Sequence, residues 1–268
     1  MNKLLSLTLS GLMAFGTAVP AGNDLETLVE IEVLDGGLTP RGTYMGAFRL
    51  TLSDGWKTYW RAPGDAGIPP TFNWRGSRNV GELSITWPTP EVFSTSGFRT
   101  IGYHDQLVLP IEITPSQAGK PVGLKGRMEL GICKDICVPS ALSFDHQLDP
   151  DAGGNPAIAA AMASRPYSAT EAGVRSAICR LSPTQGGMQI EAHIAMPSAG
   201  GTEIAVIEPG DPQFYVGETS SERRGKTLVA TAEVYHASAG AIALDRSDLR
   251  ITVLGSKHAV DIQGCTPE

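Results

Sequence analysis

Four cysteines are the residues of this chain best suited to chemistry, and two of them lie close together. Cys133 and Cys137 are separated by three residues. In an extended strand they would lie about 13 Å apart, because the chain rises roughly 3.3 Å per residue. A disulfide requires Cα atoms within roughly 7 Å. A bond between them therefore requires a tight turn or one turn of helix, and its chemistry would be thiol–disulfide exchange.

The other two cysteines, Cys179 and Cys265, would close a far longer loop. Four cysteines allow three pairings, and the sequence alone does not choose among them. The chain-entropy estimate is roughly 4.5 kcal/mol for a loop of about 87 residues, against about 2 kcal/mol for the short loop. We therefore expect Cys179 and Cys265 to form a structural disulfide; the rival is a second redox pair or free thiols. The short loop gives Cys133 and Cys137 only a small gain in stability from a disulfide, which favours a redox role for this pair.

The neighbours of the short pair bear on its reactivity and on an alternative role. Lys134 favours a thiolate, whereas Asp135 opposes it. Two cysteines are too few for structural zinc, which takes four ligands. Cu(I) would accept the two thiolates, with Met128 or His104 as a further ligand. A copper-binding protein is therefore one alternative to a redox carrier, and an interaction module with two structural disulfides is another.

Several other chemistries find no support in the sequence. The net charge of −7 and the pI near 5.3 provide no basic surface for nucleic acid. There is no nucleotide-binding glycine loop and no Gly-x-Ser-x-Gly nucleophile motif. Trp56, Tyr59 and Trp60 could form a binding platform, but Trp and Tyr are mostly buried in small domains, so we predict a packed cluster. We expect no cofactor.

The N-terminus has the pattern of an export signal. A positive start is followed by an apolar run over residues 4–19, and Val19-Pro20-Ala21 suits cleavage after Ala21. The apolar run is too short to span a membrane comfortably. We predict a signal peptide over residues 1–21 and a mature chain that is not inserted in a membrane. Export places the cysteines in an oxidising compartment, where disulfides persist.

The elements that position the cysteines are predicted to be β-strands. Alternation of apolar and polar residues marks strands at residues 29–34, 46–52, 107–113, 123–130 and 141–148. A second group lies at residues 177–181, 188–194, 203–207, 227–235 and 249–254. Strands 123–130 and 141–148 flank the cysteine turn. Pro110 suggests that its strand is an edge strand or carries a bulge.

A short helix is predicted between the two groups of strands. Asn155 suits an N-cap, Pro156 suits the first helical position, and residues 157–163 are alanine-rich. We therefore predict an all-β chain of two immunoglobulin-like β-sandwich domains joined by a short linker helix. The expected organisation is a first domain over residues 22–150, a linker over 151–170 and a second domain over 171–268.

The first domain resembles the N-terminal periplasmic domain of the thiol:disulfide interchange protein DsbD. The matching stretches are residues 54–60 (DGWKTYW), 67–70 (GIPP), 102–110 (GYHDQLVLP) and 133–139 (CKDICVP). The last is the specific one, and its Cys-x-x-x-Cys spacing is similar to that of the ScsB-like, copper-sensitivity suppressor branch. The resemblance covers residues 25–150 well and the second domain more weakly.

That resemblance implies a periplasmic, protein-disulfide reductase-type carrier with Cys133 and Cys137 as its redox-active residues. It implies exchange with thioredoxin-like proteins, in which Cys137 attacks first by analogy. The DsbD cap loop would fall at residues 94–100, with Phe98 and Tyr103 as shielding side chains. Because this chain has no membrane bundle or thioredoxin domain, we expect a separate membrane electron-transfer protein as its donor. A role in copper tolerance is the alternative implied.

Overall fold

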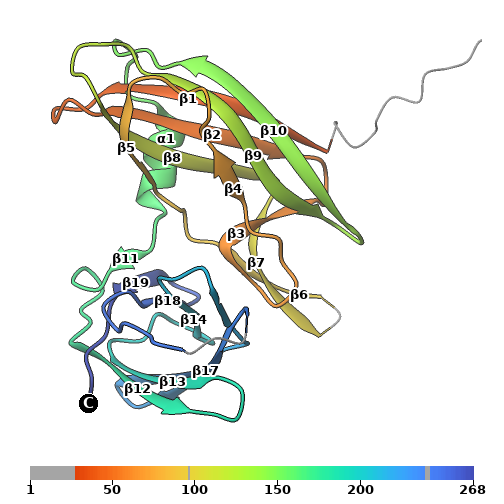
Figure 1. The fold of residues 1–268 in the computed structure, drawn as a ribbon, viewed down its shortest axis with the longest axis vertical. Coiled ribbons are helices and arrows are strands. Elements are labelled where there is room, and N and C mark those ends of the chain that lie inside the picture. The colour runs from red at the N-terminus through yellow and green to blue at the C-terminus, as the bar shows by residue number, and fades with distance from the viewer. Residues whose placement is uncertain (1–27, 96, 239–241) are drawn as a thin grey trace, which may run out of the picture.

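The computed structural model describes residues 28–95, 97–238 and 242–268, which fold into two stacked β-sandwiches (Figure 1). Each sandwich consists of two sheets, and the described part of the chain has a single α-helix. The predicted all-β fold class is confirmed. The predicted signal peptide lies outside the described residues. No helix within these residues is long and apolar enough to cross a membrane.

The first sandwich pairs a sheet of order β1-β2-β8-β5 with a sheet of order β10-β9-β3-β7-β6, in which β4 also pairs with β9. The strands are β1 Val29–Leu38, β2 Tyr44–Leu52, β3 Lys57–Gly64, β4 Thr71–Asn73, β5 Val80–Ile85, β6 Glu91–Thr95, β7 Phe98–His104, β8 Gln106–Pro115, β9 Gly123–Cys133 and β10 Cys137–Gln147. Apolar side chains of both sheets, including Phe48, Trp60 and Ile111, form one buried core. The sequence pattern predicted β1, β2, β8, β9 and β10 but none of β3 to β7.

Pro110 lies in an interior strand, although the sequence suggested an edge strand or a bulge. Its strand, β8, is bonded to β2 on one side and to β5 on the other. The Thr86 N–H donates to the Pro110 carbonyl at 2.9 Å, immediately beyond the last β5–β8 pair, Ile85 with Ile111. Proline can accept in that position but has no N–H to return. Pro110 therefore ends the pairing with the outermost strand and leaves the pairing with β2 intact.

Helix α1, Pro156–Ala163, begins as the sequence predicts. The Asn155 side chain accepts a hydrogen bond from the Ala157 N–H at 3.0 Å. The buried Ile158 packs with Leu34 and Ala47 of the first sandwich. Since Ala47 lies next to the core residue Phe48 in β2, the helix covers the face of that sheet opposite to the core. The predicted linker helix is therefore docked on the first sandwich.

The second sandwich pairs a sheet of order β11-β19-β18-β14 with a sheet of order β12-β13-β17-β15, in which β16 also pairs with β17. The strands are β11 Tyr167–Ser168, β12 Ser176–Pro183, β13 Met188–Ala195, β14 Ile204–Glu208, β15 Phe214–Val216, β16 Ser220–Arg224, β17 Thr227–His236, β18 Arg250–Leu254 and β19 Ala259–Gln263. Cys179 of β12 is bonded to Cys265, beyond β19, with Cα atoms 5.8 Å apart. The bond fastens the last residues of the chain to an early strand of this sandwich.

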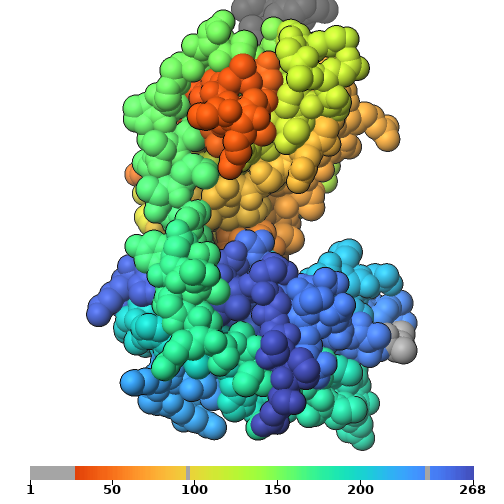
Figure 2. All heavy atoms as spheres, turned by 90° about the vertical axis from the view of Figure 1, so that its left-hand side faces the viewer, coloured from red at the N-terminus to blue at the C-terminus, as the bar shows by residue number. Residues whose placement is uncertain are grey.

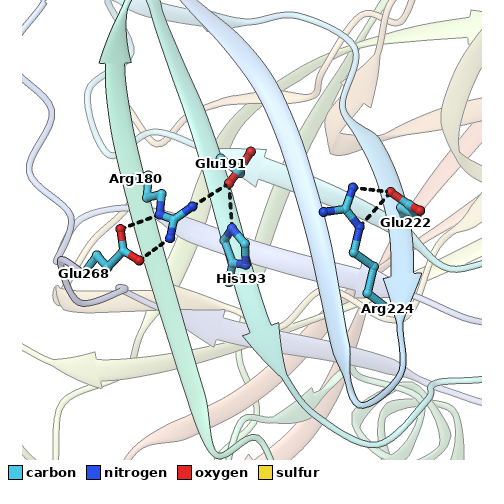
Figure 3. A network of polar contacts seen from close by, with 6 residues as sticks. All are labelled: Arg180, Glu191, His193, Glu222, Arg224 and Glu268. Atoms are coloured by element: carbon cyan, nitrogen blue, oxygen red, sulfur yellow. Dashed lines mark hydrogen bonds and ion pairs between the residues drawn. The ribbon is translucent and has the colours of Figure 1, made fainter.

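Polar contacts hold the C-terminal residue against the same sheet (Figure 3). Arg180 of β12 contacts Glu268 with two of its nitrogens and reaches Glu191 of β13 at 3.4 Å. His193 Nε2 lies 2.6 Å from the same Glu191 carboxylate. Arg180 and Glu268 are exposed, and exposed ion pairs contribute little stability individually. Their effect is to position the end of the chain rather than to stabilise the fold.

Two arginines of the first sandwich reach across to the second. Arg61 in β3 donates from Nε and Nη2 to the two carboxylate oxygens of Glu208, each at 2.9 Å. Its guanidinium also lies 4.1 Å from the centroid of the buried Trp60 ring. Arg99 in β7 pairs with Glu218 at 2.8 Å. Figure 2 shows the two sandwiches in contact, with the green segment that contains α1 running down across their junction.

Candidate functional site

Cys133 and Cys137 lie at the two ends of the tight turn between β9 and β10. They face each other across the ladder, and their sulfurs are bonded, with Cα atoms 4.2 Å apart. The Lys134 N–H donates to the Ile136 carbonyl at 3.0 Å, which closes the turn. The turn thus supplies the geometry that a bond over three intervening residues requires. Figure 1 shows this hairpin end projecting at the side of the first sandwich.

The two sulfur-bearing residues differ in access. Cys133 is only 1% exposed, whereas Cys137 is an exposed residue. Ile136, next to Cys137 at the tip of the turn, is 67% exposed. A thiolate from another molecule can therefore approach Cys137 but not Cys133. The apolar Ile136 side chain would meet that molecule first.

Tyr59 is the side chain that contacts both sulfurs. Its hydroxyl donates to Cys133 Sγ at 2.9 Å and lies 3.3 Å from Cys137 Sγ. The residue is 2% exposed, and burial raises the pKa of its hydroxyl, so the group remains a donor at neutral pH. A hydroxyl in this place can stabilise a thiolate on either sulfur when the bond is broken.

The sequence predicted Tyr59 to be part of a packed aromatic cluster, and the buried Tyr59 and Trp60 agree with packing. Its contact with the sulfurs was missed. The signal that could have found it is the pairing of β3 with β9, in which Lys57 lies opposite Cys133. Tyr59, two residues along the strand, shares the face of Lys57 and Cys133. That register depends on a long-range pairing that the local sequence pattern does not contain.

Lys57 lies between Cys133 and the next strand of the sheet. It is opposite Cys133 on one side and opposite His104 on the other. Its ammonium donates to Thr100 Oγ1 at 3.2 Å and lies 4.8 Å from the centroid of the Phe93 ring. Partial burial lowers the pKa of Lys57. Because Thr100 and Phe93 belong to β7 and β6, the ammonium points to the side of β3 away from Cys133.

The structure does not bring the predicted shielding residues to the disulfide. Phe98 lies at the end of the β6–β7 hairpin and is 57% exposed. His104 is the β7 residue level with Cys133, because both are paired with Lys57. Phe98 is six residues along β7 from His104, which corresponds to about 20 Å. Tyr103 is buried and donates its hydroxyl to the Pro88 carbonyl at 2.8 Å. Among the described residues, Tyr59 contacts the sulfurs in their place.

The residues predicted as further copper ligands are not gathered around the sulfurs. Met128 is 1% exposed and belongs to the core of the first sandwich. His104 lies 3.1 Å from Glu91 and 3.4 Å from Asp105. Within the described ranges, no group of three or more His, Cys, Asp or Glu residues could hold a metal ion. Copper binding by the two thiols alone stays a prediction.

A loop after β3 packs on the Tyr59 ring and on the strand that leads to Cys133. A Cβ atom added at Gly67 would lie 2.8 Å from the Tyr59 ring. One added at Gly131 would lie 2.8 Å from Ile68 Cβ and 3.1 Å from the Tyr59 ring. Real Cβ atoms do not approach so closely, so both positions require glycine. The loop and the sulfur-contacting tyrosine are therefore in direct contact.

Comparisons with known proteins agree with the geometry. Residues 35–147 match the family model described as thiol:disulfide interchange protein DsbD, N-terminal. The whole fold is similar to that of the N-terminal periplasmic domain of ScsB from Proteus mirabilis, with a TM-score of 0.68 and 21% identity. That match covers 94% of this chain and 97% of the other, so it includes both sandwiches. No curated protein matches the sequence.

Proposed function

We propose that this chain is a periplasmic thiol–disulfide exchange protein with Cys133 and Cys137 as its redox-active pair, because residues 35–147 match the family model of the DsbD N-terminal domain. The observation that carries the proposal is a bonded pair of one buried and one exposed cysteine. A purely structural disulfide has no need of an exposed cysteine at a hairpin tip. The Tyr59 hydroxyl beside both sulfurs supports the same conclusion.

The exchange proceeds through Cys137. A partner thiolate attacks Cys137 Sγ, the bond to Cys133 breaks, and Cys133 leaves as a thiolate that the Tyr59 hydroxyl stabilises. The second thiolate of the partner then attacks the partner's own sulfur in the mixed disulfide. Cys137 leaves as a thiolate, the partner is oxidised to a disulfide, and this chain has gained two electrons. In the reverse direction, Cys137 attacks a disulfide of another protein and Cys133 resolves the intermediate.

We propose thioredoxin-like periplasmic proteins as acceptors or donors in this exchange, and a separate membrane electron-transfer protein as the other partner. A projecting turn with an exposed Ile136 suits docking against a protein better than enclosure of a small molecule. The two sandwiches are proposed as the domains predicted at residues 22–150 and 171–268, with residues 151–170 connecting them. Cys179 and Cys265 are proposed as the structural pair.

The reduction potential of the Cys133–Cys137 pair tests this function. The protein is equilibrated in glutathione buffers of graded potential, and its thiols are alkylated and counted by mass spectrometry. We expect a potential between about −270 and −120 mV, the range of exchange proteins. A potential well below about −300 mV, as structural disulfides show, would overturn the proposal.

Single-cysteine variants test the order of attack. Cys133→Ser leaves the exposed sulfur, and it should form a mixed disulfide with glutathione disulfide readily. Cys137→Ser leaves the covered sulfur and should react at least about tenfold more slowly, because thiol reactivity depends on access. Equal rates for the two variants would contradict the assignment of Cys137 as the attacking residue.

A further inference from the structure

A groove lies at the junction of the two sandwiches, and the exchange chemistry does not use it. It encloses a cavity of about 450 Å³, within the range of ligand sites. One wall is the end of β3 and the loop after it, including Pro63 and Pro69, and the other is the segment from β14 to β15, including Val206, Pro212 and Tyr215. Tyr215 is 56% exposed. Prolines and aliphatic side chains therefore form an accessible apolar surface between the sandwiches.

The groove continues toward the disulfide. Pro69 lines both the junction groove and a second cavity of about 480 Å³. That second cavity is also lined by Leu130 of β9 and Pro139 of β10. Pro139 is two residues from the exposed Cys137. The two cavities thus adjoin at Pro69, and together they extend from the junction to β10, the strand that begins at the exposed Cys137; we call the pair of cavities the trough.

The junction part of this trough is acidic. Its charged lining residues are two arginines and four acids, namely Arg61, Arg99, Asp65, Glu208, Asp211 and Glu218. Both arginines are already engaged by carboxylates, Arg61 by Glu208 and Arg99 by Glu218. Within the part of the chain that the structure describes, the two remaining carboxylates accept only backbone N–H groups, Asp65 from Arg99 and Asp211 from Gln213. The groove therefore offers negative charge to a ligand and favours a basic group.

We propose that this trough binds an extended segment of the polypeptide with which Cys137 exchanges, with apolar residues along it and a basic residue in the junction groove. The inference rests on the proposed exchange function and names the chemistry of its partner. The trough has apolar residues along both cavities and four carboxylates in the junction groove against one, Glu129, in the second cavity, which matches such a segment in shape and charge. The second sandwich then has a function, because it supplies one wall of the groove.

The test measures binding apart from sulfur chemistry. In the Cys133→Ser/Cys137→Ser double variant, binding of a fluorescent peptide of about twelve residues, roughly 40 Å when extended, is followed by anisotropy. The peptide alternates Leu and Ser, with two Lys at one end. A second peptide carries Glu in place of Lys. We expect the Lys peptide to bind more tightly at low than at high salt, and the Glu peptide to bind at least about tenfold more weakly.

Groove variants and matched surface variants locate the binding. Tyr215→Ala should weaken binding about tenfold, as expected for an aromatic anchor, whereas Tyr167→Ala should leave it unchanged. Tyr167 is a fair control because it is similarly exposed, at 45%, and does not line the groove. Glu218→Lys should weaken binding of the Lys peptide, and Glu222→Lys should not. Both glutamates are exposed and pair with an arginine, but only Glu218 lines the groove.

Three outcomes of the binding measurements would overturn the inference. They are failure of the Lys peptide to bind, equal binding of the two peptides, and equal effects of the groove and control variants. A groove that instead joins two copies of this chain would show as a dimer in sedimentation that Tyr215→Ala dissociates, and this also overturns it. Failure of the exchange function is distinguishable, because it appears in the glutathione titration and leaves peptide binding by the double variant unaffected.

Discussion

The reactivity of the disulfide depends on how its two sulfurs are surrounded. Cys137 is open to another molecule, while Cys133 is covered and shares the Tyr59 hydroxyl. A leaving thiolate at a covered position requires a donor, since burial without one disfavours the charged form. The Tyr59 hydroxyl supplies that donor. The covered sulfur is therefore suited to leave and the open sulfur to be attacked.

Tyr59→Phe tests this role at the scale of one atom. A hydrogen bond to a charged group contributes about 1.5 kcal/mol or more, and one pKa unit corresponds to about 1.4 kcal/mol. Loss of the hydroxyl should therefore raise the pKa of the first thiol to ionise in the reduced protein by about one unit. The pH dependence of iodoacetamide alkylation measures this pKa.

Tyr103→Phe is the matched control for that substitution. It also removes a buried tyrosine hydroxyl, but one that donates to the Pro88 carbonyl rather than to a sulfur. We expect a small loss of stability and an unchanged thiol pKa. If Tyr59→Phe also left the thiol pKa unchanged, the hydroxyl would have only a packing role. An equal rise in both variants would indicate a general effect of loosened packing.

The reactive pair could be predicted from local sequence, whereas its covering residue could not. The spacing of Cys133 and Cys137 required a tight turn, and the small entropy of the short loop favoured a redox role. Tyr59 reaches the sulfurs only through the pairing of β3 with β9, which joins segments about 70 residues apart. Phe98 was predicted as a shielding residue by resemblance. The register of β7 places it six residues along the strand from His104, the residue level with Cys133.

At the scale of elements, the strands that the sequence predicted are those with long apolar–polar alternation. β3, which carries Tyr59 and Trp60, has three consecutive buried residues, Thr58 to Trp60, and so lacks that alternation. Strands β15 and β16 are short and contain no fully buried residue, and they depend on β17 for pairing. Helix α1 was predictable because its cap is local. Its docking on the first sandwich was not, because that depends on Ala47 facing outward from β2.

The Cys179–Cys265 bond should stabilise the fold more than the short reactive bond. The two cysteines are 86 residues apart in sequence, against four for Cys133 and Cys137. Loop entropy then predicts a loss of about 4 kcal/mol for Cys179→Ala/Cys265→Ala and at most about 2 kcal/mol for Cys133→Ala/Cys137→Ala. Urea unfolding measures both. A larger loss for the reactive pair would contradict the assignment of the structural and reactive bonds.

A buried ion pair supports the start of β14. Glu203 accepts hydrogen bonds from the Arg223 guanidinium, at 2.7 Å from Nε, and from the Ala199 N–H at 2.7 Å. Burial raises the pKa of Glu203, but these bonds outweigh it and leave the pKa below its usual value. Glu203→Ala leaves the Arg223 charge without its carboxylate partner and should lower the free energy of unfolding by about 3 kcal/mol at pH 7.

The pH dependence of that loss has a defined sign. A carboxylate with a lowered pKa in the folded state contributes stability above its unfolded pKa of about 4.3, and this is lost as the pH falls through the folded pKa. The difference between wild type and Glu203→Ala should therefore be constant near neutrality and shrink below about pH 4. Glu222→Ala, which removes an exposed partner of Arg224, should leave the unfolding temperature nearly unchanged. A loss that persists undiminished in acid would assign the effect to packing instead.

At the scale of the molecule, the second sandwich is attached to the first through charge and through apolar contact. Leu254 and Ala259 of the second sandwich join the core cluster of the first. Arg61 adds a bond from Nη2 to the buried Thr252 hydroxyl at 3.3 Å, besides its pair with Glu208. A junction of this kind fixes the groove between the sandwiches. The groove wall that carries Pro69 is continuous with the loop that packs on Tyr59.

Arg61→Met tests whether this junction is held by the arginine. The substitution keeps an apolar stem over Trp60 but leaves Glu208, whose side chain is 20% exposed, without its cation. Removing one member of such a partly buried pair should lower the stability of the protein by about 2 kcal/mol. This loss weakens the contact between the two sandwiches and not the interior of either one. Calorimetry should then resolve two unfolding transitions, because the sandwiches no longer unfold together. Amide hydrogens of β14 should also exchange faster than in wild type.

Arg49→Met, which removes an exposed pair with Glu32 inside the first sandwich, should change neither measurement. A single, merely lowered transition for Arg61→Met would mean that apolar contact alone holds the sandwiches together.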